Sequence, residues 1–266
     1  LKPLDLITEV NGESIKWQNL NEVVSKKIRW PKWSEVELTI FRESENKVFK
    51  VKLVRDNISV PSVSGKILEL TWWNKIWYIE ISKFGEDTEK LMEDTISELR
   101  QTQVKWIVLD LRWNWWWIVN IAVEIASHFI PKDKVVVETR YKSAAWEMMK
   151  SNWYGEYEGK PIVILVDWLT ASASEIIAWA LSQQAWAKLI WTKTFGKGSI
   201  QTIYTFKDWS SFKYTVGRWY MPDGKTIDKV WIEPDIKIDA DLKLYDEQHI
   251  DNQLEKAKEE LSKMIK

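Results

Sequence analysis

The sequence predicts an α/β fold with a mainly parallel central sheet, preceded by a small β-rich module. From residue 75 onward, apolar runs of strand length alternate with helical patterns, which is typical of a parallel sheet with helices. Residues 1–55 carry short alternating strands and one helix instead, and the proline-containing joint 55–68 separates the two patterns. A chain of 266 residues, 45% hydrophobic and 29% charged, has the composition of a soluble globular protein of one large or two modest domains.

The N-terminal module, residues 1–55, reads as a β-rich domain with one helix. DLITEVNGESI alternates apolar and polar residues around a tight turn at Asn11-Gly12. Residues 19–28 form an amphipathic helical pattern. Residues 34–55 predict a β-hairpin that closes near Glu45 and Asn46.

The core domain is predicted to span residues 56–241. Its strands and helices alternate along the chain: strand 75–84, helix 87–101, strand 104–112, helix 118–130, strand 161–167, helix 170–184 and strand 187–192. Further strands follow within 199–239, and residues 242–266 predict a charged amphipathic helical tail. Functional sites in such sheets lie beyond the carboxyl ends of the strands, where the 113–117 loop and Ser172 both fall.

Ser172 and Lys197 are predicted to lie side by side. Ser172 stands at a strand-to-helix corner; the helix carries the chain roughly 18 Å away, and the next strand brings it back a similar distance. A buried, uncharged lysine can take the proton of a serine nucleophile, and the free amide of Ala173 at the helix start suits an oxyanion. Spacing alone leaves an alternative open, because Ser172 with Glu175 also fits an ordinary capping box.

Four motifs carry a resemblance to a known family. TASASEI, TFGKGSIQT, GRWYMPDGKTI and WIEPDI, in this order, resemble the C-terminal processing peptidases, the tail-specific serine proteases of family S41 that use a Ser/Lys dyad. The resemblance implies a crotonase/ClpP-like core, with Ser172 as nucleophile, Lys197 as general base and Gln201 orienting the lysine. It also implies a second oxyanion amide from Trp116, and it favours the first serine of S-A-S-E over Ser174.

The resemblance extends to the N-terminal module, which is similar to a PDZ domain that lacks its beginning. It implies that Arg55 couples peptide binding to the active site, and that residues 135–160 form an edge hairpin where Tyr154 and Tyr157 either line the substrate path or pack. The implied partners are the C-termini of protein substrates, with a homo-oligomer open, and no cofactor. The implied location is extracytoplasmic. The chain begins with Leu1 rather than methionine, so an upstream targeting segment or membrane anchor stays open.

Tryptophan is in unusual excess. The chain has 20 tryptophans and only 9 glycines, where average usage would give roughly 19 glycines. Many of the tryptophans stand where the family has glycine, as in DLRWNWWW (110–117) and at Trp186, Trp191 and Trp231, whereas the family tolerates an aromatic residue at Trp219. We therefore hypothesise a stop codon read as glycine in the source organism. Genuine tryptophans in the loop would instead favour a catalytically inactive peptide-binding protein on the same scaffold.

Other function classes find little support. A net charge of −1 and a pI near 6.3 give no electrostatic footprint for nucleic acid or an anionic membrane surface. Zero cysteines exclude disulfides and thiolate metal sites. The two histidines, His128 and His249, lie in no metal-spaced pair, and a Ser/His/Asp triad would have to recruit one of them from afar. A crotonase-type acyl-CoA enzyme remains an alternative, although no distinct site for a CoA phosphate is evident.

Overall fold

The computed structural model divides the chain into two compact units. It describes residues 1, 5–29, 31–58, 60–70, 74–114, 118–142, 145–152 and 155–264. One unit comprises residues 1–60 with 241–250, and the other comprises residues 61–240 with 251–266. The division therefore falls at residue 60, within the predicted joint 55–68, and it assigns the two halves of the C-terminal tail to different units.

The N-terminal unit is built on a four-stranded antiparallel sheet of order β2-β1-β3-β4. Its strands are β1 (Leu6–Val10), β2 (Glu13–Ser14), β3 (Glu35–Arg42) and β4 (Lys47–Val54). Asn11 and Gly12 join β1 to β2 with φ of 53° and 79°, which confirms the predicted turn. The β3–β4 hairpin closes through a short 3₁₀ turn, η2 (Glu43–Glu45), and a left-handed Asn46, as predicted.

One helical segment packs on this sheet. It starts as α1 (Leu20–Glu22) and continues as the π-helical η1 (Val23–Ile28), so the predicted helix over 19–28 is present. Asn19 caps it, because its side-chain oxygen accepts from the amides of residues 21 and 22 at 3.0 and 3.3 Å. The small core of the unit contains Val10, Val23, Val36, Leu38 and Ile40.

The second unit contains the predicted mainly parallel sheet. Its six strands run in the order β14-β11-β10-β7-β6-β5, and all neighbours pair in parallel except β5 with β6. They are β5 (Val63–Glu69), β6 (Lys75–Ile81), β7 (Trp106–Asp110), β10 (Ile162–Val166), β11 (Lys188–Trp191) and β14 (Ile236–Lys237). The long apolar runs of β7 and β10 follow from burial on both faces of the sheet.

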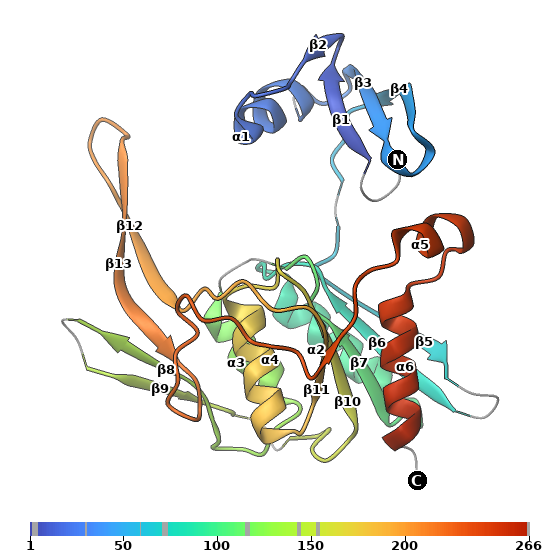
Figure 1. The fold of residues 1–266 in the computed structure, drawn as a ribbon. Coiled ribbons are helices and arrows are strands. Elements are labelled where there is room, and N and C mark those ends of the chain that lie inside the picture. Colours follow the sequence, from blue (N-terminus) through green and yellow to red (C-terminus); the bar gives the residue numbers. More distant parts are fainter. Residues whose placement is uncertain are drawn as a thin grey trace. The chain divides into compact units, whose positions relative to one another are not determined.

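Helices cover both faces of this sheet (Figure 1). On one face lie α2 (Thr88–Arg100), α3 (Val119–Ser127) and α4 (Ala173–Gln184), and on the other lies α6 (Asn252–Met264). Alternate residues of β6 serve the two layers, with Ile79 packed in the larger core and Tyr78 in the smaller core under α6. Among the described residues, no helix combines the length and the apolar composition needed to cross a bilayer.

A second sheet of four antiparallel strands stands beside the first, in the order β12-β13-β8-β9. It comprises β8 (Val135–Tyr141), β9 (Glu147–Lys150), β12 (Ser199–Thr205) and β13 (Ser211–Tyr220). The β8–β9 hairpin was predicted from residues 135–160, but its pairing with β13 was not. Figure 1 shows the β12–β13 hairpin projecting from the rest of the unit.

The C-terminal tail forms two helices where the sequence predicted one. The first, α5 (Leu242–Gln248), ends at His249, which adopts a left-handed conformation with φ of 57° and cannot continue an α-helix. The second, α6, starts after Asp251, whose carboxylate accepts from the amides of Gln253 and Leu254 at 3.0 Å each. The charged pattern alone did not reveal this break.

Candidate active site

Ser172 occupies the strand-to-helix corner between β10 and α4, as predicted. Its backbone is strained, with φ of 59° and ψ of −114°, and such strain in a residue other than glycine is concentrated at functional sites. The residue is only 1% exposed, and its Oγ has no hydrogen-bond partner within the described part of the chain. A buried hydroxyl without a partner is costly, so this Oγ is a candidate reactive group.

Glu175 joins the corner to the loop that carries Lys197. Its Oε2 accepts from the backbone amides of Ser172 and Lys197, both at 2.9 Å. Its Oε1 accepts from the Thr194 hydroxyl at 2.6 Å and from the Gly196 amide at 2.7 Å. Burial raises the pKa of Glu175, while these four hydrogen bonds oppose that shift. One buried carboxylate therefore fixes the backbones of the predicted nucleophile and the predicted base relative to each other.

Two glycines shape the Lys197 loop. Gly196 has φ of 83°, a left-handed conformation that side chains rarely tolerate. Gly198 approaches the backbone of Asp228 so closely that a Cβ would lie 2.2 Å from the Asp228 nitrogen. Burial lowers the pKa of Lys197, the positive charge of Lys213 lowers it further, and Glu175 opposes both effects. The direction of the shift is the one a neutral general base requires.

The three residues predicted as the catalytic group line one cavity. Ser172, Lys197 and Gln201 border a space of about 150 Å³, together with Ile203 and Lys213 among others. An adjoining hollow of about 470 Å³ shares Lys197 and Gln201 with it. The structure thus brings these three residues together around a space beside the Ser172 corner.

The loop after β7 is bonded to the Ser172 corner. The carbonyl oxygen of Asn114 accepts from the Ala171 amide at 3.0 Å and from the Ser174 hydroxyl at 3.3 Å. The Asn114 side chain donates to the carbonyl of Ile81, at the end of β6, at 2.7 Å. The Ser174 hydroxyl is therefore engaged in a hydrogen bond, whereas Ser172 Oγ is not; the choice of Ser172 over Ser174 as nucleophile stays a prediction.

Of the two amides predicted to stabilise an oxyanion, those of Ala173 and Trp116, only that of Ala173 lies within the described residues. Ala173 is the first residue of α4 and is fully buried, and within the described residues its amide donates no hydrogen bond. It therefore remains available to a developing negative charge beside Ser172. Trp116 lies outside the described residues.

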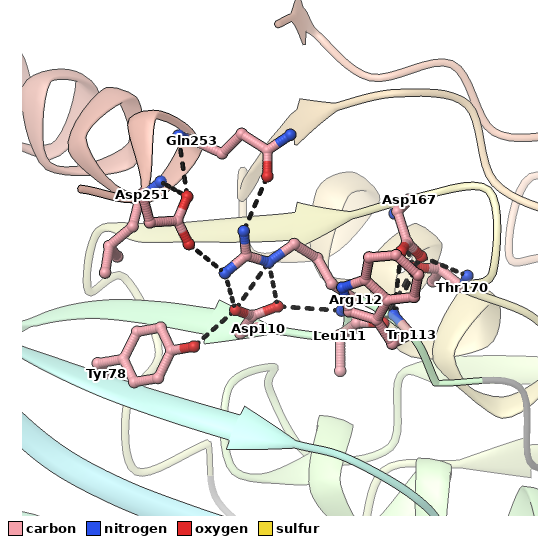
Figure 2. A network of polar contacts seen from close by, with 10 residues as sticks. Tyr78, Asp110, Leu111, Arg112, Trp113, Asp167, Thr170, Asp251 and Gln253 are labelled. Carbon is pink, nitrogen blue, oxygen red and sulfur yellow. Dashed lines mark hydrogen bonds and ion pairs between the residues drawn. The ribbon is translucent and has the colours of Figure 1, made fainter. Parts of the chain in front are cut away.

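A buried ion-pair network anchors the carboxyl end of β7, as Figure 2 shows. The Arg112 guanidinium donates to Asp110 at 2.6 Å, to Asp251 at 2.7 Å and to the Gln253 side chain at 2.8 Å. Asp110 also accepts from the Tyr78 hydroxyl at 2.6 Å. These contacts bind the first turn of α6 to the end of β7, so the C-terminal helix helps to hold Arg112 in place.

A second carboxylate joins the loops after β7 and β10. Asp167 accepts from the Trp113 amide, with both oxygens at 3.1 Å, and from the amides of Leu169 and Thr170 at 3.0 and 2.8 Å (Figure 2). The Thr170 carbonyl in turn accepts from the Phe195 amide at 3.0 Å. Three loops, after β7, β10 and β11, are therefore cross-linked around the Ser172 corner.

Arg55 lies at the end of the N-terminal unit. It donates to the carbonyls of Lys27, Ile28 and Glu35 at 2.8, 2.6 and 2.7 Å, and to the Ser34 hydroxyl at 2.6 Å. These contacts tie the end of η1 to the start of β3, within the unit. A coupling of Arg55 to the active site stays a prediction.

The histidines lie apart from this site. His128 caps the end of α3 and is buried, which lowers its pKa, and His249 ends α5. Neither lines the cavities beside Ser172. The described residues contain no His, Cys, Asp and Glu cluster able to hold a metal ion.

Tyr157 is 7% exposed and packs against Phe129, while Tyr154 lies outside the described residues.

A comparison with protein-family models decides the family. The model "Peptidase family S41" matches residues 75–238, more than half of the chain, and the match spans the Ser172 corner and the Lys197 loop. The chain belongs to peptidase family S41. Its fold is therefore the mixed α/β fold of this family, and the recognition from the TASASEI and TFGKGSIQT motifs is confirmed.

Named relatives of this S41 chain include processing proteases. It is 41% identical over 241 residues to a "Probable CtpA-like serine protease" of Staphylococcus aureus, covering 90% of this chain and 47% of the relative. It is 37% identical over 237 residues to the "Carboxy-terminal processing protease CtpA" of Bacillus subtilis, covering 89% and 49%. The S41 chain thus spans about half the length of these relatives.

Solved structures agree on the fold. A photosystem II D1 C-terminal processing protease superposes with a TM-score of 0.66 at 24% identity, covering 88% of this chain and 63% of that one. A putative S41 protease from Bacteroides fragilis superposes with a TM-score of 0.70 at 17% identity, covering 100% and 75%.

Proposed function

We propose that this chain is a serine endopeptidase of the C-terminal processing type that cleaves protein substrates near their C-termini with a Ser172/Lys197 dyad. The observation that carries the proposal is the Glu175 carboxylate, one oxygen of which accepts from the amides of both residues at 2.9 Å. The names of the relatives, a CtpA-like serine protease and a carboxy-terminal processing protease, support the substrate class.

In the proposed reaction, Ser172 Oγ attacks the scissile carbonyl while the neutral Lys197 amine takes the hydroxyl proton. The tetrahedral oxyanion is stabilised by the Ala173 amide and by an amide of the 115–117 loop, for which Trp116 is proposed. The lysine then returns its proton to the leaving amine, and an acyl-enzyme remains on Ser172. A water molecule, deprotonated by the same lysine, hydrolyses the ester. Gln201 is proposed to orient Lys197.

Peptide cleavage by purified variants tests this proposal. Ser172→Ala and Lys197→Ala are expected to lose cleavage of a fluorogenic peptide by about a thousandfold or more, with unchanged circular dichroism. A serine-reactive phosphonate should label Ser172 in the unaltered chain, as read by peptide mass spectrometry. Retained cleavage by Ser172→Ala refutes the assignment. Peptide binding without labelling or turnover would instead support the inactive peptide-binding alternative.

We further propose that the N-terminal unit is PDZ-like and captures substrate tails by strand addition, and that Arg55 couples its occupancy to the active site. A four-stranded sheet with a packed helix suits that mode of recognition. Fluorescence anisotropy with a tail peptide and its C-terminally amidated form provides the test, since carboxylate capture requires tighter binding of the free acid. An extracytoplasmic location is proposed from the family resemblance and is checked by fractionation of source cells.

A further inference from the structure

The strand β12 has a free edge that begins beside the candidate active site. It starts two residues after Lys197, and within the described residues it pairs only with β13. An outer strand leaves alternate N–H and C=O groups without partners, ready to pair with another extended chain. Residues 199–201 of β12 also line the cavity that holds Ser172 and Lys197, so the free edge is continuous with that cavity.

The two faces of the β12–β13 hairpin differ. Residues opposite one another in an antiparallel pair share a face. Ile203 pairs with Lys213, and both line the active-site cavity. Tyr204 pairs with Phe212 on the other face, where four rings gather in two contacts, with centroids 5.0 and 5.5 Å apart. These rings are Tyr204 (58% exposed), Phe206 (50%), Phe212 (58%) and Tyr214 (41%).

We infer that an extended segment of the substrate docks as an added strand on the free edge of β12, and that Tyr204 and Phe206 select apolar side chains in it. Successive side chains of a strand point to opposite faces. Alternate substrate residues would therefore face the cavity beside Ile203 and the exposed rings. The inference rests on the proposed peptidase function and names its substrate class: an unfolded segment with apolar residues at every second position.

Backbone N-methylation tests the strand pairing. A peptide cleaved by the unaltered enzyme is made as a series with one N-methyl group moved along consecutive positions. Strand addition predicts an alternating pattern, in which every second N-methyl lowers kcat/KM by about two- to tenfold and those between have little effect. Equal effects at all positions overturn the inference. Cleavage that persists in Ser172→Ala instead refutes the peptidase assignment itself, so the two failures are distinguishable.

A matched pair of variants tests the aromatic face. Tyr204→Ser removes a ring from the edge strand, and Tyr214→Ser removes one from the same face of the inner strand β13. We expect Tyr204→Ser to raise KM for a long apolar peptide about two- to fivefold, with kcat and the KM of a short peptide unchanged, and Tyr214→Ser to do neither. If Tyr204→Ser changes the oligomeric state in gel filtration but leaves KM unchanged, a second copy of the chain covers the rings and the inference is wrong.

A separate observation concerns the tryptophans. A left-handed φ is strained for residues with bulky side chains and is adopted mainly by glycine, asparagine and aspartate. Six tryptophans adopt it: Trp17 (67°), Trp33 (65°), Trp113 (62°), Trp186 (57°), Trp191 (116°) and Trp209 (67°). Of the 20 tryptophans, seven lie outside the described residues, so these are six of the remaining thirteen. Trp219, which packs in the core at 7% exposure, is not among them, nor is Trp231.

We propose that glycine occupies these six positions in the natural protein, with UGA codons translated as glycine. Five of the six side chains are more than half exposed, and Trp17 reaches 93%, so burial does not offset the backbone strain there. Two of the six positions lie near the end of β7. The rings of Trp113 and Trp191 are tilted against each other with centroids 6.3 Å apart, and the Arg112 guanidinium lies over the Trp191 ring, so glycine at both positions would open space beside Arg112.

Peptide mass spectrometry of the protein from its source organism tests this proposal. Glycine at the six positions, with UGA in the coding DNA and UGG at Trp219, is the expected result; UGG or a tryptophan mass at the six positions overturns it. Recombinant chains supply a second readout. Changing all six tryptophans to glycine should raise the unfolding temperature by roughly ten degrees, whereas the control Trp219→Gly should lower it. A fall in the sixfold variant would count against the proposal.

Discussion

Replacing Glu175 by glutamine probes the link between the backbones of the proposed nucleophile Ser172 and the proposed base Lys197. Glutamine keeps the shape of the side chain but offers one oxygen in place of two. If that oxygen retains the amides of Ser172 and Lys197, the NH₂ group faces the amide of Gly196, now a donor against a donor. If it turns the other way, the Ser172 and Lys197 amides lose their shared acceptor.

The free-energy cost follows from these contacts. A hydrogen bond to a charged acceptor contributes about 1.5–3 kcal/mol, and a buried amide left without a partner costs about 1–3 kcal/mol. We therefore expect the free energy of unfolding to fall by about 3 kcal/mol. A domain with about 5–15 kcal/mol of stability remains folded after this loss. Activity should fall further, by roughly a hundredfold in kcat, because displacement of a catalytic group by about 1 Å has an effect of that size.

Urea unfolding and peptide hydrolysis, measured on the same samples, check the prediction. Glu260→Gln is the matched control. Glu260 lies on α6, is 4% exposed, and accepts hydrogen bonds from the side chains of Lys188 and Lys263 at 3.0 and 2.6 Å. It should lose stability but keep its kcat. If Glu175→Gln shows the same loss of stability and an unchanged kcat, Glu175 is only a helix cap and the reasoning fails.

Three further predictions concern the surroundings of the dyad. Lys213→Met removes a positive neighbour that lowers the pKa of Lys197, so the pKa of Lys197 should rise and less of its amine should be neutral at a given pH. The ascending limb of the pH–kcat profile is therefore expected to shift to higher pH. A shift to lower pH contradicts the assignment. Gly198→Ala places a Cβ 2.2 Å from the Asp228 nitrogen and should lower kcat at least tenfold with a stability loss of about 1–3 kcal/mol, measured by thermal unfolding. Asp251→Asn weakens the network at the end of β7 and should cost about 2 kcal/mol in urea unfolding, and no change would show that α6 docks without it.

Periodicity predicted the elements of the core well, because β7 and β10 are buried on both faces and α2 carries a regular apolar stripe. The second sheet was missed. The β8–β9 hairpin and the β12–β13 hairpin lie far apart in the sequence, and their pairing through Tyr220 and Glu138 depends on tertiary packing, which strand patterns do not encode. The break in the tail was missed for a related reason, since a left-handed His249 leaves no mark on a charge pattern.

At the site, the lengths of a helix and a strand were enough to bring Lys197 level with Ser172. They could not reveal the Arg112 network, because Asp251 stands 139 residues from Arg112 and belongs to a segment read only as a charged tail. Glu175 was visible in the S-x-x-E spacing, yet its contacts with Thr194 and Gly196 depend on a loop whose conformation the sequence did not fix.

The capping box and the proposed nucleophile, alternatives at the level of sequence, are compatible with each other in the structure. A helix cap needs only one acceptor for the Ser172 amide, and a carboxylate has two oxygens with about four lone-pair sites. Glu175 uses one site on that amide and the others on the Lys197 loop, while Ser172 Oγ stays without a partner. Glu175, the third residue of α4, therefore holds the N-cap residue Ser172 and the lysine loop on the same carboxylate. The S-x-x-E spacing thus does not exclude a nucleophile at Ser172, because the same glutamate serves the helix start and the Lys197 loop.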